Sequence, residues 1–452
     1  MPEPIKRDDV EELGQARYIA GKHPTLLHTD AYGWLKYNGT FWDRSQANAR
    51  VFTTVSDTLE TRRKAVRSQT TEERIIEACE PSVRNINAIM THLKAICSTD
   101  VEALDAGFDF LNVANGLLDL KTGELIRHTF SQRFTYCLSI PYLETASTAA
   151  WETFLMQCVG GGQEVVDFLQ LCVGYSLTGH SSEEKMFYVY GPTRSGKGVF
   201  TETLLNLLGL PLATEVDFTT FTRERQQDAN NFDLAPLKPA RFVAASESSK
   251  YERLNEAKIK QMTGGNYIRC AFKYGDHFSY RPQYKLWLTS NYDVNADPHD
   301  DAVWGRIVRF EFPNSHQGNE DKKLKNRLRT PQNMAGILKW CVQGAQRWYE
   351  KGLTIPQVLM QHLDTSRAEL DTIAHWLEER IELDDKSFMS NVMIRQSYNG
   401  WCEANGVKPF ESRQLGRSLA RRPGLERAKE EGNRGFMGMR LRDLSVWEHG
   451  RE

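Results

Sequence analysis

The stretch MFYVYGPTRSGKGVFTETLLNLLG, residues 186–209, decides the fold class. It begins with five apolar residues in a row, which is typical of a buried strand. The pattern GxxxxGK follows, from Gly191 to Lys197, and the remainder places Phe200 and Leu204 on one face of a helix. In a strand-loop-helix of this kind, backbone N–H groups and the positive end of the helix bind phosphates, and the lysine reaches the terminal ones. The sequence therefore predicts a nucleotide site in an α/β fold.

One position departs from the usual form of this loop. Gly198 follows Lys197, where a Ser or Thr would hold Mg²⁺. We expect ATP and Mg²⁺ as cofactors, with the metal held through water or through another hydroxyl such as that of Thr201. A loop that binds nucleotide without hydrolysing it is the alternative. The residues expected to contact the nucleotide are Gly191, Pro192, Thr193, Arg194, Ser195, Gly196, Lys197, Gly198, Val199 and Thr201.

Three later apolar runs indicate further strands of the same type: Phe242 to Ala245, Tyr284 to Thr289 and Ile307 to Phe312. Polar segments compatible with helices separate them, and apolar residues recur at helical spacing over residues 151–177. Strands that alternate with helices predict an α/β sheet. Ahead of this core, an Asn-Gly pair at 38–39 predicts a hairpin turn, and short apolar runs with turn signals over 110–128 predict a β-meander.

Three polar residues at the ends of these strands are candidate catalytic groups. Glu247 follows one strand, where a carboxylate could polarise water or hold Mg²⁺ through water, although the residue before it is Ser246 and not a second acid. Asn291 follows the next strand and could sense the γ-phosphate, and Arg306 precedes the last strand and could act as an arginine finger on a neighbouring subunit's nucleotide. Taken singly, a solvated carboxylate, a turn asparagine and a surface ion pair are the simpler interpretations.

The order of these segments resembles the superfamily 3 helicases, in particular the viral and phage/plasmid primase-helicase group. GPTRSGKGVF resembles the Walker A segment, RFVAASE Walker B, LNEAKIKQMTGGNYIRCAFK the B′ element, KLWLTSN motif C, and WGRIVRFEFPN the arginine-finger segment. The likeness covers residues 105–315 well, including NVANGLLDLKTGEL and LCVGYSLTG upstream of the phosphate loop. The resemblance implies a hexameric ring of AAA+-like subunits with ATP at each interface and DNA through the centre, tracked 3′ to 5′. It also implies that Lys260 reaches the adjoining subunit's nucleotide.

The segment Phe272-Lys273-Tyr274, followed by Gly275-Asp276, has the composition of a DNA-binding loop. A cation binds the phosphate backbone of any sequence, and an aromatic ring stacks on any base. By resemblance to the B′ hairpin of the family, Lys273 is the expected pore residue, with Phe272 or Tyr274 beside it. An ordinary solvated turn is the alternative.

The C-terminal region is the most basic part of the chain. Residues 408–442 contain ten Lys and Arg residues and four Glu residues, a local charge of +6 in a chain of formal charge −2. Two helical segments and two short strands around residues 432–438 have the pattern of a winged helix. A basic helix packed on an acidic neighbour is the alternative. The DNA contacts expected on the second helix are Arg413, Arg417, Arg421 and Arg422.

Length and composition bound the remaining possibilities. The 452 residues are enough for two to four domains, and 57 Lys and Arg against 59 Asp and Glu exclude a protein that is basic over its whole surface. The eight cysteines are scattered without a zinc pattern, so reduced thiols are expected, and no apolar run is long enough for a signal peptide or a membrane span. A protein of the bacterial host cytoplasm without membrane contact is therefore expected.

We expect an α/β protein with an AAA+-like P-loop ATPase core, a helical collar, a mixed α+β N-terminal domain and a C-terminal winged helix. The predicted domains are an N-terminal α+β domain over 1–147, the ATPase core with its preceding collar over 148–330, a helical connector over 331–365 and the winged helix over 366–452.

The leading function hypothesis is an ATP-dependent replicative DNA helicase of a phage, prophage or mobile element. Its expected partners are single-stranded and forked DNA, further copies of the chain in a hexamer, and a separate primase or initiator protein. A nucleotide-gated origin-binding or loader protein with little turnover is the alternative, and a small-molecule kinase fits less well because Asn291 and Arg306 have no part in it. Primer synthesis is not expected, since the first hundred residues show no cluster of metal-binding carboxylates.

Overall fold

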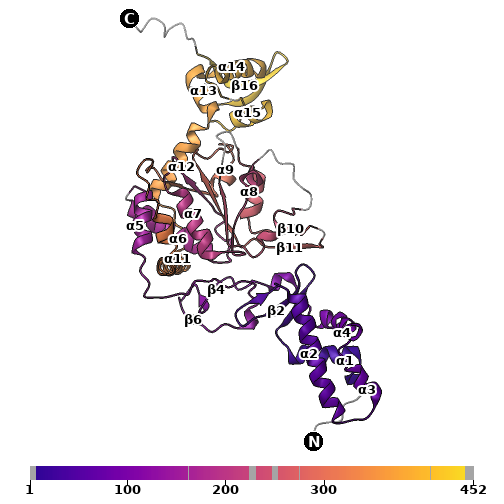
Figure 1. Cartoon of the computed structure of the whole chain (residues 1–452). Coiled ribbons are helices and arrows are strands. Elements are labelled where there is room, and N and C mark those ends of the chain that lie inside the picture. Colours follow the sequence, from indigo (N-terminus) through magenta and orange to yellow (C-terminus); the bar gives the residue numbers. More distant parts are fainter. Residues whose placement is uncertain are drawn as a thin grey trace. The chain divides into compact units, whose positions relative to one another are not determined.

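The computed structural model describes residues 7–160, 162–222, 231–246, 253–273, 275–407 and 409–442 (Figure 1). Contacts divide the chain into two compact units. The first consists of Met1–Val294 and Gly305–Leu359, and the second of Asn295–Trp304 and Met360–Glu452. The second unit therefore includes a short segment that lies, in sequence, within the first.

The first unit begins with four helices and a small antiparallel sheet. Apolar residues three and four apart on α4, including Ile86, Ile89 and Leu93, pack into a core with α1 and α2. In the sheet, Asn38 Oδ1 accepts hydrogen bonds from the N–H groups of Thr40 and Phe41, at 3.0 Å each, which closes the predicted hairpin turn. The elements are α1 (Glu12–Lys22), β1 (Leu26–Thr29), β2 (Gly33–Tyr37), β3 (Trp42–Asp43), α2 (Ala47–Arg67), α3 (Glu73–Ala78) and α4 (Val83–Ile96).

The predicted meander forms a second antiparallel sheet, β4 (Phe110–Val113), β5 (Gly116–Asp119) and β6 (Leu125–Ile126). Buried residues of this sheet, such as Leu111, belong to the same core cluster as Trp151 of the following helix. The predicted boundary between residues 147 and 148 therefore lies inside one continuous hydrophobic core.

The centre of the first unit is a five-stranded parallel sheet in the order β13-β7-β12-β9-β8. Aromatic residues from four elements form its core: the ring of Trp287 lies 4.4 Å from that of Phe187, 5.6 Å from Phe242 and 5.4 Å from Phe200 between centroids. The fold is mixed α/β with a parallel sheet. The strands are β7 (Met186–Tyr190), β8 (Ala213–Glu215), β9 (Phe242–Ser246), β12 (Lys285–Ser290) and β13 (Ile307–Glu311).

Four helices lie on the face of the sheet that carries these rings (Figure 1). Two of them, α6 and α11, approach each other closely: a Cβ at Gly174 would lie 2.0 Å from the backbone N of Ala345, so only glycine fits there. The helices are α5 (Ala149–Cys158), α6 (Gln163–Leu177), α7 (Lys197–Leu208) and α11 (Pro331–Lys351), and α10 (Leu324–Leu328) precedes the last of these.

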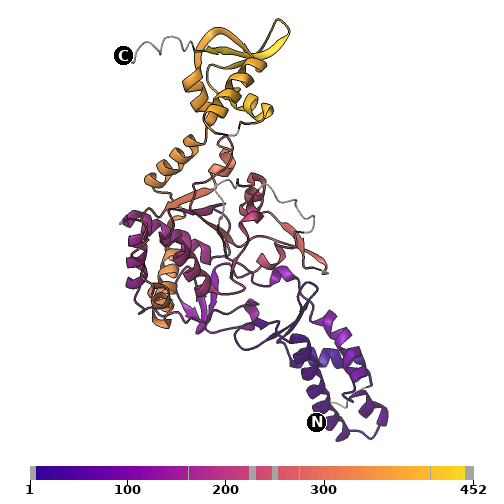
Figure 2. The same ribbon diagram turned by 45° about the horizontal axis from the view of Figure 1, so that its top comes forward.

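The opposite side of the sheet carries α8 and a two-stranded hairpin, away from α5 and α6 in both views (Figure 2). The hairpin consists of β10 (Ile268–Ala271) and β11 (His277–Tyr280), with Ala271 opposite His277 next to the turn. It follows α8 (Glu256–Thr263), whose N-cap Asn255 accepts a hydrogen bond from the N–H of Lys258.

Buried cations hold the amino-terminal edge of the central sheet to the surrounding chain. Lys285 Nζ donates to the carbonyl oxygens of Thr178 at 2.6 Å and His180 at 2.9 Å, and Arg241 donates to the carbonyl of Gly107 at 3.0 Å. Burial lowers the pKa of Lys285 well below its usual value. The carbonyl groups near the end of α6 thereby receive positive partners.

In its described residues, the second unit contains four further helices and a three-stranded antiparallel sheet in the order β14-β16-β15. Trp376, Tyr398 and Leu419 are buried in its own hydrophobic core. Its elements are α9 (Asp301–Trp304), α13 (Thr372–Arg380), β14 (Ile381–Ser390), α14 (Asn391–Ala404), α15 (Ser412–Leu419), β15 (Glu426–Glu430) and β16 (Asn433–Leu441), and α12 (Gln357–Glu369) contains the boundary between the units.

Candidate nucleotide-binding site

The phosphate loop lies between the carboxyl end of β7 and the start of α7, as the sequence predicts. Gly196, the N-cap of α7, has φ +98°, and a Cβ there would lie 2.4 Å from Sγ of Cys158 on α5. Glycine is required at this position for both reasons. The left-handed backbone of Arg194, φ +65°, adds a second sharp turn, and the N–H of His316 donates to the Arg194 carbonyl at 3.1 Å.

Lys197 is buried, and its ammonium group binds four neutral oxygen atoms. Nζ donates to the carbonyls of Gly191 at 2.6 Å and Pro192 at 2.8 Å, to Ser195 Oγ at 3.2 Å and to Asn291 Oδ1 at 3.0 Å. Burial lowers the pKa of Lys197 to about 8. The acceptors of this cation among the described residues are all neutral, and such a cation is suited to an anionic ligand such as a polyphosphate.

Asn291 follows β12, the strand next to β7, so its side chain reaches Lys197 at the carboxyl edge of the sheet. The residues after it are held by side chains of β7 and of β13, the strand on the far side of β7. Tyr188 of β7 donates its hydroxyl to the carbonyl of Tyr292 at 3.0 Å, and Arg309 of β13 binds both carboxylate oxygens of Asp293 at 2.8 and 2.9 Å. The structure thus brings Lys197 and Asn291 together and fixes the backbone that carries Asn291.

Gly198 and Thr201 occupy the first turn and a half of α7. A Cβ at Gly198 would meet only Glu202 Oε1, at 3.9 Å, so an added Cβ has room there. Thr201, expected to assist with Mg²⁺, is buried and its hydroxyl donates to the carbonyl of Lys197 at 3.1 Å. Val199 is half-buried on the same helix. At residue 198, where a Ser or Thr usually holds Mg²⁺, there is thus space but no hydroxyl. The hydroxyl of Thr201 is engaged within the helix.

Arg306 lies at the amino end of β13, at the opposite edge of the sheet from Lys197 and Asn291. Five strand residues separate the two edges by about 13–17 Å. Its guanidinium pairs with Glu184 at 2.5 Å, so it does not meet Lys197 of its own chain.

Glu247 and Lys260 are the two remaining residues predicted to act at the nucleotide. Glu247, expected to act as a base or to hold Mg²⁺ through water, lies outside the described residues. The strand before it is described, and Ser246 Oγ lies 3.0 Å from Thr289 Oγ1 across the β9–β12 pair. Lys260 is half-buried in the last turn of α8.

The predicted DNA loop lies at the turn of the β10–β11 hairpin. Phe272 packs between Phe278 and Tyr32, with ring centroids 5.5 and 5.7 Å away, and Lys273 is exposed. Tyr274 lies outside the described residues. Phe272 thus supports the turn from one side, while Lys273 is accessible to a ligand.

The predicted arginines of the second unit have two kinds of surroundings. Arg413 and Arg417 are exposed on α15. Arg422 forms an ion pair with Asp371, and Arg421 donates to the carbonyl of His299 at 3.0 Å. The latter two therefore have partners within the chain, whereas Arg413 and Arg417 point to solvent.

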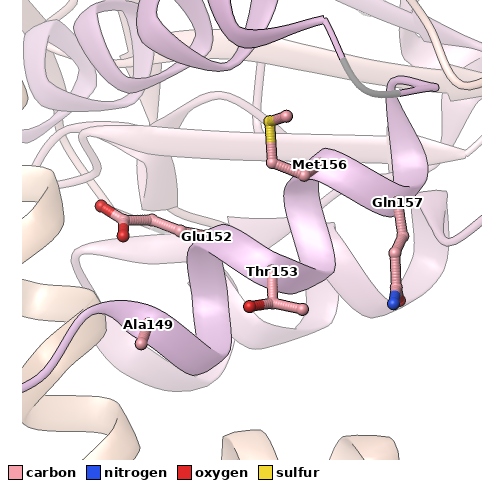
Figure 3. A pocket seen from close by; sticks show the side chains of 5 residues that line it. All are labelled: Ala149, Glu152, Thr153, Met156 and Gln157. Carbon is pink, nitrogen blue, oxygen red and sulfur yellow. The ribbon is translucent and has the colours of Figure 1, made fainter.

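A pocket of about 450 Å³ lies on α5, lined by Ala149, Glu152, Thr153, Met156 and Gln157 (Figure 3). It contains none of the predicted nucleotide contacts, although Cys158 of the same helix lies beneath Gly196. All eight cysteines are free thiols, and burial raises the pKa of Cys158 to about 12. Among the described residues, no cluster of His, Cys, Asp or Glu has a metal-binding arrangement, and no helix has the length and apolarity to cross a membrane.

Sequence reasoning missed Arg309, Asp293 and Cys158 as parts of this site. A charged residue inside the apolar run IVRFE is the signal that could have identified Arg309, because a buried strand rarely carries an unpaired arginine. Nothing in the sequence connects Cys158 to Gly196, which lie on different elements.

Comparisons with known proteins find two family models that each match part of the chain and distant similarity to viral proteins. A family described as "D5 N terminal like" matches residues 15–160, and a family of unknown function, DUF5906, matches residues 189–306. The chain is 22% identical to "Putative helicase L207/L206" of Acanthamoeba polyphaga mimivirus over 67% of its own length and 34% of that protein. These matches support a primase-helicase-like family.

A second distant viral relative is "Putative primase C962R" of African swine fever virus, isolate Warthog/Namibia/Wart80/1980. It is 20% identical over 71% of this chain and 36% of the viral protein. The chain thus spans about a third of the length of these relatives. Among solved structures, the apo NrS-1 C-terminal region is similar with a TM-score of 0.43 and 11% identity, over 68% of this chain and 80% of that one.

Proposed function

We propose that this chain is a replication enzyme of the primase-helicase type, which hydrolyses ATP with Mg²⁺ at the phosphate loop and uses the energy to move along DNA. The observation that carries the proposal is the 3.0 Å hydrogen bond from Lys197 Nζ to Asn291 Oδ1, at the end of two neighbouring parallel strands. The names of the relatives, helicase and primase, support a role in replication.

The residues of the loop fit a bound nucleotide. Lys197 now donates to four neutral oxygens, and phosphate oxygens are stronger acceptors that would replace them. When bound, Mg-ATP supplies the phosphoanhydride bond and a metal that neutralises the developing charge. The backbone N–H groups at the start of α7 and the Lys197 ammonium would then stabilise the phosphates, and the Asn291 amide would orient water or contact the terminal phosphate.

The proposed assembly is a homohexameric ring of the AAA+-like, superfamily 3 type. Lys197 and Arg306 lie at opposite edges of one sheet, so a ring is the arrangement in which Arg306 of one subunit serves the nucleotide of the next. Lys260 is the second proposed contact to that nucleotide. The proposed direction of movement, from the family resemblance, is 3′ to 5′.

The proposed DNA contacts are at two places. The hairpin turn, with Lys273 exposed and Phe272 packed behind it, would contact single-stranded DNA. In the second unit, the element order helix, strand, two helices and two strands supports a winged helix, and its exposed Arg413 and Arg417 would contact phosphates of forked or double-stranded DNA.

The test is Lys197→Ala, with the exposed Lys322→Ala as a matched control. DNA-stimulated ATP hydrolysis and strand separation should fall roughly 10²–10³-fold in the first variant and be unchanged in the second. A wild-type protein that neither hydrolyses ATP nor separates strands would refute the proposal.

Gly198 favours a second candidate, an origin-binding or loading protein that binds nucleotide with little turnover, because this position lacks a hydroxyl for Mg²⁺. Brisk multiple-turnover hydrolysis would exclude it. Primer synthesis should be measured in the same preparation with ribonucleotides and single-stranded template, because the African swine fever virus relative is named a primase, and the expectation of no primer synthesis therefore has no support from the relatives.

A further inference from the structure

Residues Asn295–Trp304 connect the two proposed catalytic residues Asn291 and Arg306, yet they belong to the second unit. Val294 before them and Gly305 after them belong to the first. Every contact described in the next two paragraphs lies within the second unit. The chain therefore leaves one unit after Asn291, joins the other, and returns one residue before Arg306.

Arg367 of α12 holds this segment at three points. Its Nε donates to the carbonyl of Pro298 at 2.6 Å, its guanidinium pairs with Asp301, and the same group lies 5.9 Å from the ring centre of Trp304. Trp304 is 3% exposed, and its indole N–H donates to the carbonyl of Asp297 at 2.8 Å. The short helix α9 is thereby fixed at its start, its end and the turn before it.

Residues of α15 and the turn after it hold the same segment from a second element. Gln414 donates to Asp297 Oδ2 at 2.7 Å, and Ser418 Oγ lies 2.8 Å from His299 Nε2. Arg421 donates to the carbonyl of His299 at 3.0 Å. The helix that we propose as a DNA contact thus carries one face that binds this segment, and Arg413 and Arg417 are exposed on the same helix.

We propose that Arg367 is a positioning residue for Arg306, and that the second unit in this way sets the activity of the nucleotide site. The inference rests on the proposed function. Arg306 follows the buried Trp304 by two residues, so their Cα atoms are at most about 7.6 Å apart, and only Gly305 separates Arg306 from a shift of α9. An arginine that stabilises a transition state is sensitive to such shifts, since a displacement of about 1 Å can cost a factor of about 10² in rate.

In the structure, Arg306 forms an ion pair with Glu184, and this pair must open before Arg306 can act on a nucleotide. The pair is 2.5 Å long, and 20% of the Arg306 side chain is exposed. An arginine held by a carboxylate of its own chain does not act on a neighbour's nucleotide.

The experiment compares ATP hydrolysis and nucleotide affinity in Arg367→Ala, Arg367→Lys and the control Arg395→Ala, an exposed arginine of α14 in the same unit. Arg367→Ala should lower kcat roughly threefold to thirtyfold and leave the Kd of a fluorescent ATP analogue within about twofold. Arg367→Lys should recover part of kcat, because it keeps the charge but loses the planar fork. Arg395→Ala should match the wild type.

A double variant tests whether Arg367 acts through Arg306. If it does, Arg306→Ala with Arg367→Ala should be no slower than Arg306→Ala alone, whereas independent effects would multiply. Losses of kcat that multiply in the double variant, or a wild-type kcat in Arg367→Ala, would overturn the inference. As long as the wild-type protein hydrolyses ATP, these results leave the proposed function intact. Absence of hydrolysis in the wild type would instead remove both.

A milder variant covers the possibility that Arg367→Ala does not fold. Trp304→Phe retains an aromatic ring in the buried position but loses the hydrogen bond to Asp297. It should also lower kcat without changing the Kd of the analogue, and hydrogen exchange should show faster amide exchange over residues 301–306. Unchanged kcat and unchanged exchange in Trp304→Phe would contradict the proposal.

Discussion

Replacing Gly196 by alanine should misplace the phosphate loop without unfolding the protein. An L-residue in the left-handed region costs about 1–2 kcal/mol, and Gly196 has φ +98°. The new methyl group would also lie 2.4 Å from Sγ of Cys158, and overpacking of this kind costs about 1–3 kcal/mol. The sum, about 2–5 kcal/mol, is a large part of the stability of an ordinary domain.

The loop and not α5 should move in response. Cys158 is 1% exposed and lies in the main hydrophobic core, whereas residues 192–194 of the loop are exposed. Movement of the loop displaces Lys197, so nucleotide affinity should fall by more than tenfold. Denaturant unfolding measures the stability, and titration with a fluorescent ATP analogue measures the affinity.

The second change Cys158→Ala separates the two causes. It removes the sulfur, so that the nearest remaining side-chain contact of the new methyl group is Phe154, at 3.3 Å. The double variant should regain the overpacking part of the loss and keep the torsional part of about 1–2 kcal/mol. Wild-type stability and affinity in Gly196→Ala, or no recovery in the double variant, would refute this reasoning.

Four further predictions concern single residues of the first unit. Burial lowers the pKa of Lys197 to about 8, and a bound triphosphate favours the charged lysine. Affinity for ATP, measured by calorimetry, should therefore be constant from about pH 7 to 8 and fall up to tenfold per pH unit above that. Lys197→Arg should show no such fall. The Cβ that Gly198→Thr adds has room, and the new hydroxyl should lower the Mg²⁺ concentration needed for half-maximal hydrolysis. An unchanged Mg²⁺ titration would show that this hydroxyl does not reach the metal. Arg309→Met leaves Asp293 without its bidentate partner and should lower the free energy of unfolding by about 2–3 kcal/mol and weaken hydrolysis, and a loss below 0.5 kcal/mol would argue against the pair's importance. Burial raises the pKa of Asp109, but hydrogen bonds from Tyr349, His180 and Lys121 outweigh this effect and lower the pKa to about 2. The carboxylate should therefore stabilise the protein above pH 4 and lose that effect as the pH falls toward 2. Asp109→Asn should remove about 1 kcal/mol of stability at neutral pH, measured by denaturant unfolding.

The central strands could be predicted because each is buried on both faces and therefore reads as an unbroken apolar run. The expected run at 186–190 coincides with β7, and those at 242–245 and 307–312 differ from β9 and β13 by one residue at one end. The run at 284–289 is shifted by one residue from β12. The hairpin at 38–39, the meander and the two helices between 149 and 177 also agree. Their signals are local, so no knowledge of the tertiary structure is needed.

The strands β8 and β14 could not be predicted, because neither has an apolar run or a regular alternation of buried and exposed residues. β8, Ala213–Glu215, has only three residues, too few for a periodic pattern. β14, Ile381–Ser390, is mostly polar, and its register shifts between Asp384 and Phe388, which breaks the alternation of buried and exposed residues.

The candidate site was predictable where one segment carries the chemistry and not where distant segments meet. Gly191 to Lys197 form a single loop, so the spacing of the pattern is enough. The pairing of Arg309 with Asp293, and the contact of Gly196 with Cys158, depend on the order of strands and on helix packing. The partners of Arg421 and Arg422, which follow α15, are similarly far away in sequence, so the sequence alone could not separate these two arginines from the exposed Arg413 and Arg417.

The strand order also has a consequence for biosynthesis. Phe187 of β7 pairs with Trp287, one hundred residues further along the chain, and Met186 pairs with Ile307, later still. At about 5–20 residues per second, a ribosome needs roughly 5–25 s to supply these partners. During that interval the apolar strand that leads into the phosphate loop has neither neighbour, so nucleotide cannot assist early folding, and a nascent chain stopped before residue 311 should require a chaperone to remain soluble.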